Sequence, residues 1–151
     1  MDGVTTVTGA INVIGATGVT LEIEATCVVS AADITMDSGL IVSSEQVDTA
    51  VLYGGTLEMV NVDGTTNTIT IYEGTCQYKP TSNAILSNLV MYGGLFDMRE
   101  CNAPTHTITN TTLHTGSIID ERNGLSNTTY TNPILAGGIV KCDLGRQVTV
   151  T

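Results

Sequence analysis

The sequence predicts an all-β fold, a right-handed parallel β-helix (β-solenoid) of about six turns with about 20–22 residues per turn. Two observations lead to this prediction: a glycine-centred phrase recurs at nearly constant spacing, and apolar and polar residues alternate in register with it. Composition agrees, because Thr, Val and 16 Gly residues are prominent in a chain of which only 13% is charged. Right-handedness follows from the usual preference of parallel crossovers.

The glycine phrase is clearest in VLYGGTLEM and VMYGGLFDM, and it recurs in TIYEGTCQY, TLHTGSIID and ILAGGIVKC. Successive anchor glycines are 19, 20, 22 and 22 residues apart, and weaker copies occur at Gly18 and Gly39. Glycine is expected at a tight corner, where φ must be positive or a Cβ would clash. The anchors are Gly55, Gly74, Gly94, Gly116 and Gly138.

Apolar residues keep fixed distances from each anchor, which predicts ladders that face inward at alternate strand positions. Three positions before the anchor lie Leu52, Ile71, Met91, Leu113 and Leu135. Two positions after it lie Leu57, Cys76, Phe96, Ile118 and Val140. Four positions after it lie Met59, Tyr78, Met98, Asp120 and Cys142. A strand upstream of the anchor adds Leu86, Ile108 and Tyr130 as further inward residues.

Asp120 interrupts an otherwise apolar ladder, and a buried carboxylate without a partner is costly. A local bulge that turns Ile118 or Ile119 inward is therefore favoured, with Arg122 close enough in sequence to pair with Asp120. The position between the last two inward ladders faces outward and is mostly polar. It carries Glu58, Gln77, Asp97, Ile119 and Lys141.

Two further ladders are expected along the axis. Asn88, Asn110 and Asn132 are spaced 22 and 22 residues apart, so their amides should stack at a turn and bond one another or the backbone. Two positions before the anchors lie Tyr53, Tyr72, Tyr92 and His114. If these face outward they form an aromatic stripe, which mutual stacking explains and which could also bind a protein partner or a glycan.

Charge and composition exclude several classes of protein. Residues 1–78 hold ten acids and no Lys or Arg, whereas residues 79–151 hold five of each sign, so a nucleic-acid partner is not expected. No apolar run approaches the roughly 18 residues of a membrane helix, and the N-terminus lacks the basic region of a secretory signal. The four widely spaced cysteines, Cys27, Cys76, Cys101 and Cys142, are expected to be reduced thiols, some of them buried.

No catalytic motif, cofactor site or metal site is predicted. Glu58 and Asp97 lie two turns apart on one outward ladder, about 10 Å, a separation that would suit an inverting glycosidase. His106 and His114 could contribute to a metal site but are expected to be exposed strand residues. Thr-x-Thr pairs at 107/109, 129/131 and 149/151 are similar to ice-binding faces, but Ile85 and Ser87 interrupt that array. GATG at 15–18 lacks the Lys-Ser/Thr of a phosphate loop.

The phrases LVMYGGLFDMRE, SIIDERNGLSNTTYTNPILAGGIVKCDLG and QVTVT resemble the turns of β-helical structural proteins of tailed bacteriophages. Within that group, a short, acidic, one-domain chain is similar to a capsid decoration (cement) protein. The resemblance implies a non-enzymatic virion protein that is made in the host cytoplasm, sits on the outer capsid surface and binds the major capsid protein. It also implies a homotrimer that bridges capsomers and stabilises the capsid. The alternative is a carbohydrate-binding or carbohydrate-cleaving module of the tail-fibre or tailspike type.

The whole chain, 1–151, is expected to form one domain. Its regular turns should span 50–151, with 1–30 as a less regular segment or a docking arm. The C-terminal RQVTVT predicts a strand with no polar cap after it, and the Val/Thr-rich N-terminus predicts another strand-forming segment. Because open strand edges associate readily, both ends are expected to need a partner.

Overall fold

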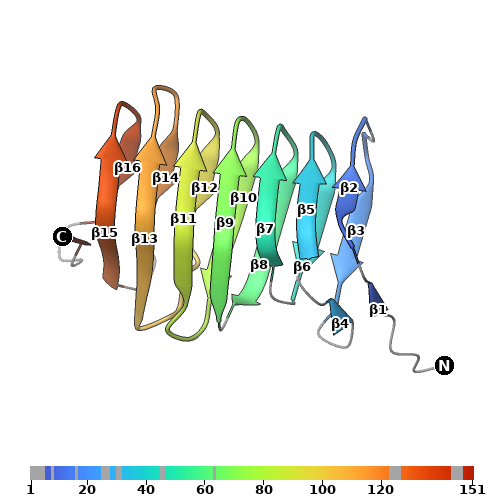
Figure 1. Cartoon of the computed structure of the whole chain (residues 1–151), viewed down its shortest axis with the longest axis horizontal. Coiled ribbons are helices and arrows are strands. Elements are labelled where there is room, and N and C mark those ends of the chain that lie inside the picture. The colour runs from blue at the N-terminus through green and yellow to red at the C-terminus, as the bar shows by residue number, and fades with distance from the viewer. Residues whose placement is uncertain are drawn as a thin grey trace.

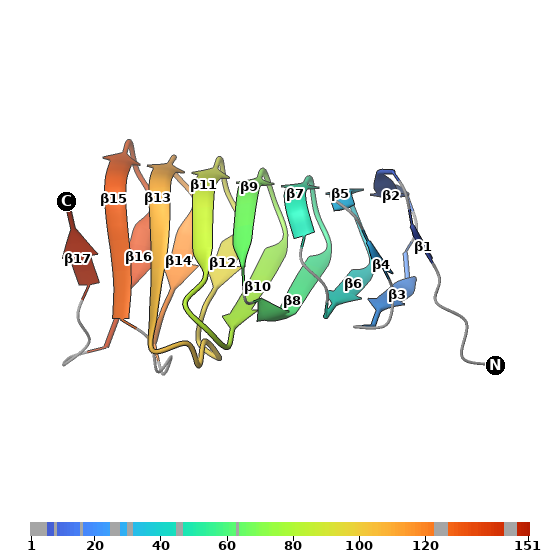
Figure 2. The same cartoon turned by 60° about the horizontal axis from the view of Figure 1, so that its bottom comes forward.

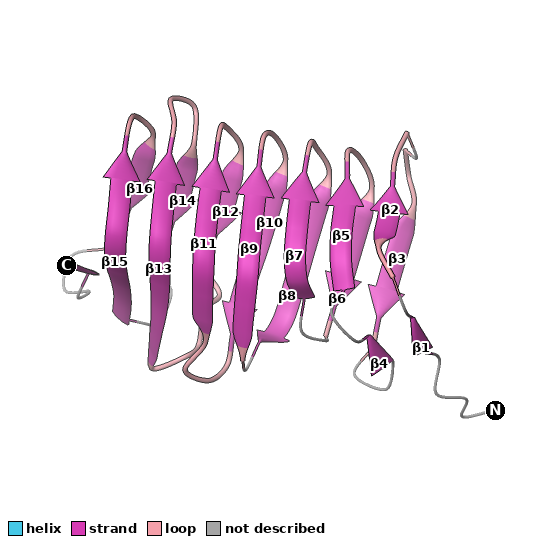
Figure 3. Ribbon diagram, viewed as in Figure 1, coloured by secondary structure: helices cyan, strands magenta, loops and turns pink. Residues whose placement is uncertain are grey.

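The structure is a computed structural model that describes residues 6–7, 9–15, 17–24, 28–29, 32–44, 47–62, 64–122, 127–143 and 148–151. Over these residues all regular secondary structure is β-strand (Figure 3). The eight-stranded sheet contains β2 (Ile11–Val13), β5 (Ala32–Met36), β7 (Val47–Leu52), β9 (Thr65–Ile71), β11 (Ile85–Met91), β13 (Thr105–Leu113), β15 (Asn127–Leu135) and β17 (Val148–Val150). The seven-stranded sheet contains β3 (Thr20–Ile23), β6 (Leu40–Ser43), β8 (Thr56–Val62), β10 (Thr75–Pro80), β12 (Leu95–Asp97), β14 (Ile118–Asp120) and β16 (Ile139–Lys141). β1 (Thr6–Val7) and β4 (Val28–Val29) form a separate pair.

The strands form a β-solenoid of about six turns, as the sequence predicts (Figure 1). Every pair is parallel, and within each large sheet a strand pairs with its equivalents one turn earlier and one turn later. The chain therefore passes from one sheet to the other and back while it advances along the axis. Residues about 20 positions apart in sequence become neighbours in space, so sequence repeats become ladders.

The long strands of the eight-stranded sheet bend in the middle. In β11, Leu86 and Leu89 are both buried, and the two residues between them are half-buried, so the period-two alternation is broken there. The paired strand β13 shows the same break between Ile108 and Thr111. The bend gives each turn two inward-facing segments, and the seven-stranded sheet supplies the third side.

The predicted inward ladders make up the core over the central turns. Leu52, Ile71, Met91 and Leu113 are at most 1% exposed, as are Leu57, Cys76, Phe96, Met59, Tyr78 and Met98. Leu86 and Ile108 are fully buried, and Tyr130 is 4% exposed. Burial of such side chains stabilises a fold by about 1.5–3 kcal/mol each before the entropy of chain ordering is counted. Stacked apolar ladders are therefore the main favourable contribution to this fold.

Glycine is required at the corner that follows the long strands. Gly74 has a φ of 86°, and a Cβ there would lie 2.5 Å from the carbonyl oxygen of Gly55 on the preceding turn. Gly55 itself has a φ of 75°. At these two corners the turn therefore lies tightly against the turn before it.

The register changes by one residue at β14, where Asp120 was the exception in the predicted ladder. Ile119 is the fully buried residue and stacks on Phe96, whereas Asp120 stacks on Asp97. The inward positions predicted for Ile118 and Asp120 are therefore wrong. Ile119 is turned in, as one form of the favoured bulge predicted, but the pairing of β14 with β12 and β16 is continuous and contains no bulge. The cause is one additional residue in the corner: four residues separate Leu113 from Ile118, but three separate Met91 from Leu95.

The last turn differs from the prediction in another way. Leu135 is 63% exposed, Val140 is 37% exposed and Cys142 is exposed, although all three occupy inward ladder positions. An inward side chain becomes buried only when a further turn covers it, and here β17 covers only Thr128–Tyr130 of β15. The apolar ladders therefore reach solvent at this end.

The N-terminal turns belong to the same solenoid. β2 pairs with β5, and β3 pairs with β6, in the same registers as the later turns. Gly18 and Gly39, the weaker copies, have positive φ values of 78° and 76°. Of the predicted docking arm at 1–30, residues 1–5, 8, 16, 25–27 (which include Cys27) and 30 lie outside the described residues.

Candidate functional site

The outward ladder on the seven-stranded sheet is the first candidate site. Glu58, Gln77 and Asp97 occupy equivalent positions on β8, β10 and β12, as the sequence predicts. Because of the register change at β14, the ladder continues through Asp120 in place of Ile119 and ends at Lys141. Below, these five residues are called the acidic ladder.

Each carboxylate of the acidic ladder is held by a cation. The Nζ of Lys79 lies 2.8 Å from Glu58 Oε1 and 2.6 Å from Glu100 Oε2. Arg99 donates from Nε and Nη2 to the two oxygens of Asp97, at 2.9 and 2.7 Å. Arg122 donates from Nε and Nη2 to the two oxygens of Asp120 at the same two distances. Its closeness to Asp120 in the sequence predicts this pairing.

This pairing bears on the hypothesis of an inverting glycosidase. The general acid of such an enzyme needs a raised pKa, so that it stays protonated near neutral pH. Hydrogen bonds from Arg99 instead lower the pKa of Asp97, and Glu58 is bonded to a lysine. A cavity of about 330 Å³ adjoins the ladder and is lined by Gln77, Lys79, Asp97, Arg99 and Glu100, which are paired charges apart from one amide. The geometry favours a structural role for these groups.

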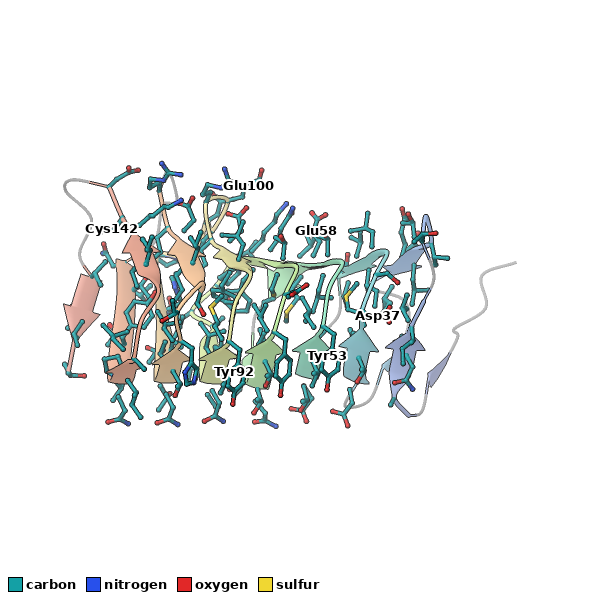
Figure 4. The ribbon with its side chains drawn as sticks, turned by 90° about the horizontal axis from the view of Figure 1, so that it is seen from above. Asp37, Tyr53, Glu58, Tyr92, Glu100 and Cys142 are labelled. Atoms are coloured by element: carbon teal, nitrogen blue, oxygen red, sulfur yellow. The ribbon has the colours of Figure 1, made fainter. Side chains whose placement is uncertain are left out.

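The aromatic stripe, Tyr53, Tyr72, Tyr92 and His114, is the second candidate site. It lies on the opposite side of the solenoid from Glu58 and Glu100 (Figure 4). Successive ring centroids are 4.9, 4.8 and 4.7 Å apart, and the rings are within 10° of parallel. The three tyrosines are 39–52% exposed, so the stripe faces outward.

The stacking limits what the stripe can bind. A sugar that packs on an aromatic side chain uses the face of the ring, but here both faces of Tyr72 and Tyr92 are covered by neighbouring rings. Tyr72 and Tyr92 therefore present only their ring edges and hydroxyls to solvent. The arrangement resembles a stabilising ladder more closely than a platform for sugars.

Asn88, Asn110 and Asn132 lie beside one another in the middle of β11, β13 and β15, at the bend of these strands. Asn110 Nδ2 donates to Asn88 Oδ1 at 2.9 Å, and Asn132 Nδ2 donates to Asn110 Oδ1 at 3.2 Å. Asn88 Nδ2 donates in turn to the carbonyl oxygen of Asn67. These bonds tie successive turns together on the surface.

A buried polar cluster between successive turns was not predicted. His106 is 3% exposed, so its predicted exposure is wrong. Its Nε2 lies 3.1 Å from Thr128 Oγ1, which donates to Glu121 Oε2, and Tyr130 donates to Glu121 Oε1. The alternation could have located His106, because it precedes the inward residue Ile108 by two positions.

Burial determines the ionisation of this cluster. Desolvation lowers the pKa of His106 to about 4, so the imidazole is neutral near pH 7. Desolvation raises the pKa of Glu121, and the hydrogen bonds from Tyr130 and Thr128 oppose that rise. The cluster is closed to solvent, since Thr128 is 2% and Glu121 7% exposed. It therefore supports packing between turns rather than chemistry on a substrate.

The remaining candidates do not combine into a site. Cys76 and Cys101 are buried and Cys142 is exposed, and these three described cysteines are thiols outside any disulfide. His114 belongs to the aromatic stripe on the surface, whereas His106 lies in the buried polar cluster, so the two histidines do not form one site. Thr107, Thr129 and Thr149 stack in register with Ile85, which ends the threonine array as predicted.

Within the described ranges no group of three or more His, Cys, Asp or Glu side chains could hold a metal ion. The same part of the chain contains no helix that is long and apolar enough to cross a membrane. No protein-family model matches the sequence, and neither the curated proteins nor the solved structures include a significant match.

Proposed function

We propose that this chain is a non-enzymatic structural protein that decorates the outer surface of a tailed-phage capsid and bridges its capsomers. The resemblance of the repeat phrases to β-helical phage proteins suggests the particle, and a rigid stacked scaffold suits the role. A solenoid presents a fixed surface, so little chain entropy is lost when it binds.

The observation that carries the proposal is the separation of charge along the axis. The net charge of −10 belongs entirely to residues 1–78, because residues 79–151 hold five acids and five bases. The turns stack in chain order, so this difference in sequence becomes a difference between the two halves of the solenoid (Figure 1). Exposed acids of the N-terminal turns include Glu24 and Asp33.

An acidic half of this kind would dock on a basic surface of the major capsid protein. Charge complementarity of exposed groups contributes mostly to association rate and selectivity, and salt weakens it. Many equivalent copies on one particle would then stabilise the capsid through avidity rather than through one strong contact. The resemblance also implies that three copies associate, side by side.

Binding to undecorated capsids tests the proposal. The protein should sediment with the particles and raise their resistance to heat, and Glu24→Gln with Asp33→Asn should weaken the binding, as should added salt. Glu58→Ala and Asp97→Ala serve as the control: they should leave capsid binding intact but would abolish the activity of a glycosidase. If the protein fails to sediment with any capsid from the cells that encode it, the proposal is wrong.

A further inference from the structure

The C-terminal end of the solenoid exposes the side chains that form the core elsewhere. Leu135 is 63% exposed, whereas Leu113 below it is 1% exposed, and Val140 is 37% exposed, whereas Ile119 below it is fully buried. Together with Leu113, Tyr130 and Val148, these residues line an apolar cavity of about 230 Å³. An exposed apolar patch of this kind marks an interaction surface.

The backbone at this end is also open. Among the described residues, β16 pairs with β14 alone, and β17 covers only Thr128–Tyr130 of β15. Residues 133–135 of β15 therefore present a strand edge on the side away from β13. A parallel edge next to an apolar core is the surface on which a further turn of a solenoid would be built.

At the opposite end of the solenoid, β2 and β3 are the last strands of the two large sheets (Figure 2). In the described part of the chain, β2 pairs with β5 alone, and β3 pairs with β6 alone. The ladder that ends at Val140 begins at Leu21, and the ladder that ends at Lys141 begins at Glu22. The ladder that ends at Leu135 begins at Val13.

We propose that the C-terminal end of one copy docks on the N-terminal end of a second copy, so that the two large sheets continue from one molecule into the next. In this head-to-tail contact Val140 would pack on the half-buried Leu21, and Leu135 would lie beside Val13, which is 9% exposed. Lys141 would lie opposite Glu22, an ion pair between directly facing strand positions. A contact between two C-terminal ends would lack this complementarity of charge, since each would offer Lys141. The contact does not depend on the proposed capsid binding.

One strand must move to allow the contact. At the C-terminal end, β17 pairs with the first half of β15. At the N-terminal end, β1 pairs with β4, and both lie below β2 and β5 in Figure 1. β17 and β1 thus lie on the same side of the solenoid, and in a continuous stack only one of them fits. β17 of one copy would replace β1 of the next, which is held by two residue pairs, Thr6 with Val28 and Val7 with Val29.

A head-to-tail contact between unlike ends does not close on itself, so it produces open chains of copies. The average molar mass, measured by light scattering after size exclusion, should therefore rise with concentration without reaching a plateau. Glu22→Lys and Lys141→Glu should each weaken association about tenfold, because each places like charges opposite one another. The double variant, Glu22→Lys with Lys141→Glu, restores the pair and should restore association.

Glu73→Lys is the matched control, because it makes the same change of charge at an exposed position in the middle of the solenoid. It should leave association unchanged. Since Glu22 is exposed and Lys141 half-buried on the surface, circular dichroism should show that the variants keep the fold. A mass that stays constant at all concentrations, an equal effect of Glu73→Lys, or a double variant no better than the single ones would each overturn the inference.

Discussion

Asp97 and Asp120 lie directly opposite each other on the adjacent strands β12 and β14. Two like charges at facing positions destabilise a sheet, yet both side chains are nearly buried. The pair is tolerated because both oxygens of each carboxylate accept hydrogen bonds from an arginine two residues later in the chain. Arg99 and Arg122 thereby lower the pKa values of both carboxyl groups.

Removal of one arginine should expose this repulsion. Arg99→Ala should lower the free energy of unfolding only modestly, because the guanidinium is half exposed and solvent screens its charge. Both folded pKa values lie below the usual 3.8, so the arginines stabilise the fold fully above that pH, and the benefit is lost as pH falls through the folded values. Urea denaturation measures the loss. In the double variant Arg99→Ala/Asp97→Asn most of it should disappear, and an undiminished loss there would contradict the explanation.

His106 should make stability depend on pH in a separate window. Its pKa is about 4 in the folded protein and 6.5 when exposed, so the unfolded chain binds a proton first. The free energy of unfolding should therefore decrease as pH falls from 6.5 towards 4, by about 1–3 kcal/mol in total. His106→Asn should remove this decrease, which thermal unfolding across the window would detect. Equal pH slopes for the variant and the parent chain would show that His106 is not the source.

Alanine substitutions at two corner glycines should separate the steric cost of an added Cβ from the strain of a positive φ. Gly74 and Gly116 both have positive φ, but a Cβ would lie 2.5 Å from a backbone oxygen at Gly74 and would meet nothing within 4 Å at Gly116. Gly116→Ala should therefore cost only the strain of positive φ, about 1 kcal/mol. Gly74→Ala should cost about 2–4 kcal/mol, because the preceding turn must also move. Denaturation midpoints of the two variants test this, and equal losses would contradict the close contact between turns.

The aromatic stripe should act as a stabilising ladder. Tyr72 stacks on two rings and Tyr53 on one, so Tyr72→Ala should cost about 1–3 kcal/mol and Tyr53→Ala about half of that. Tyr72→Phe keeps the stacks and should cost little. Soluble glycans should leave tyrosine fluorescence unchanged, since the ring faces of Tyr72 and Tyr92 are covered. A saturable change in fluorescence would instead favour the carbohydrate-binding alternative.

Much of this fold could be predicted because its repeat is local. Gly55 and Gly74 occupy equivalent corners, and period-two alternation places Leu57 and Met59 inward without knowledge of any other turn. Contacts that depend on the length of a corner were harder to predict, and one additional residue before Ile118 was enough to bring Ile119 into the core. The exposure of Leu135 could not follow from its own ladder, because burial depends on whether another turn covers it.

The candidate sites were predictable to a smaller degree, because their contacts depend on the register between turns. Sequence spacing aligned Glu58 with Asp97, but it did not show that Lys79 and Arg99 would neutralise them, because those pairs depend on how the chain leaves each strand. The cluster around His106 joins residues from two turns and from the segment after β14. Its partners, Thr128 and Glu121, can be identified only once the register of the turns is fixed.

We propose that this protein is a structural part of a virus particle. Particles can be purified by density gradient from cells that encode the chain, and the protein in each fraction can be quantified by mass spectrometry, with antibody labelling of intact particles. The protein should band with the particles at a fixed ratio to the major capsid protein and should be accessible on their outer surface. If it occurs only in the free fraction of the gradient, the proposal is wrong.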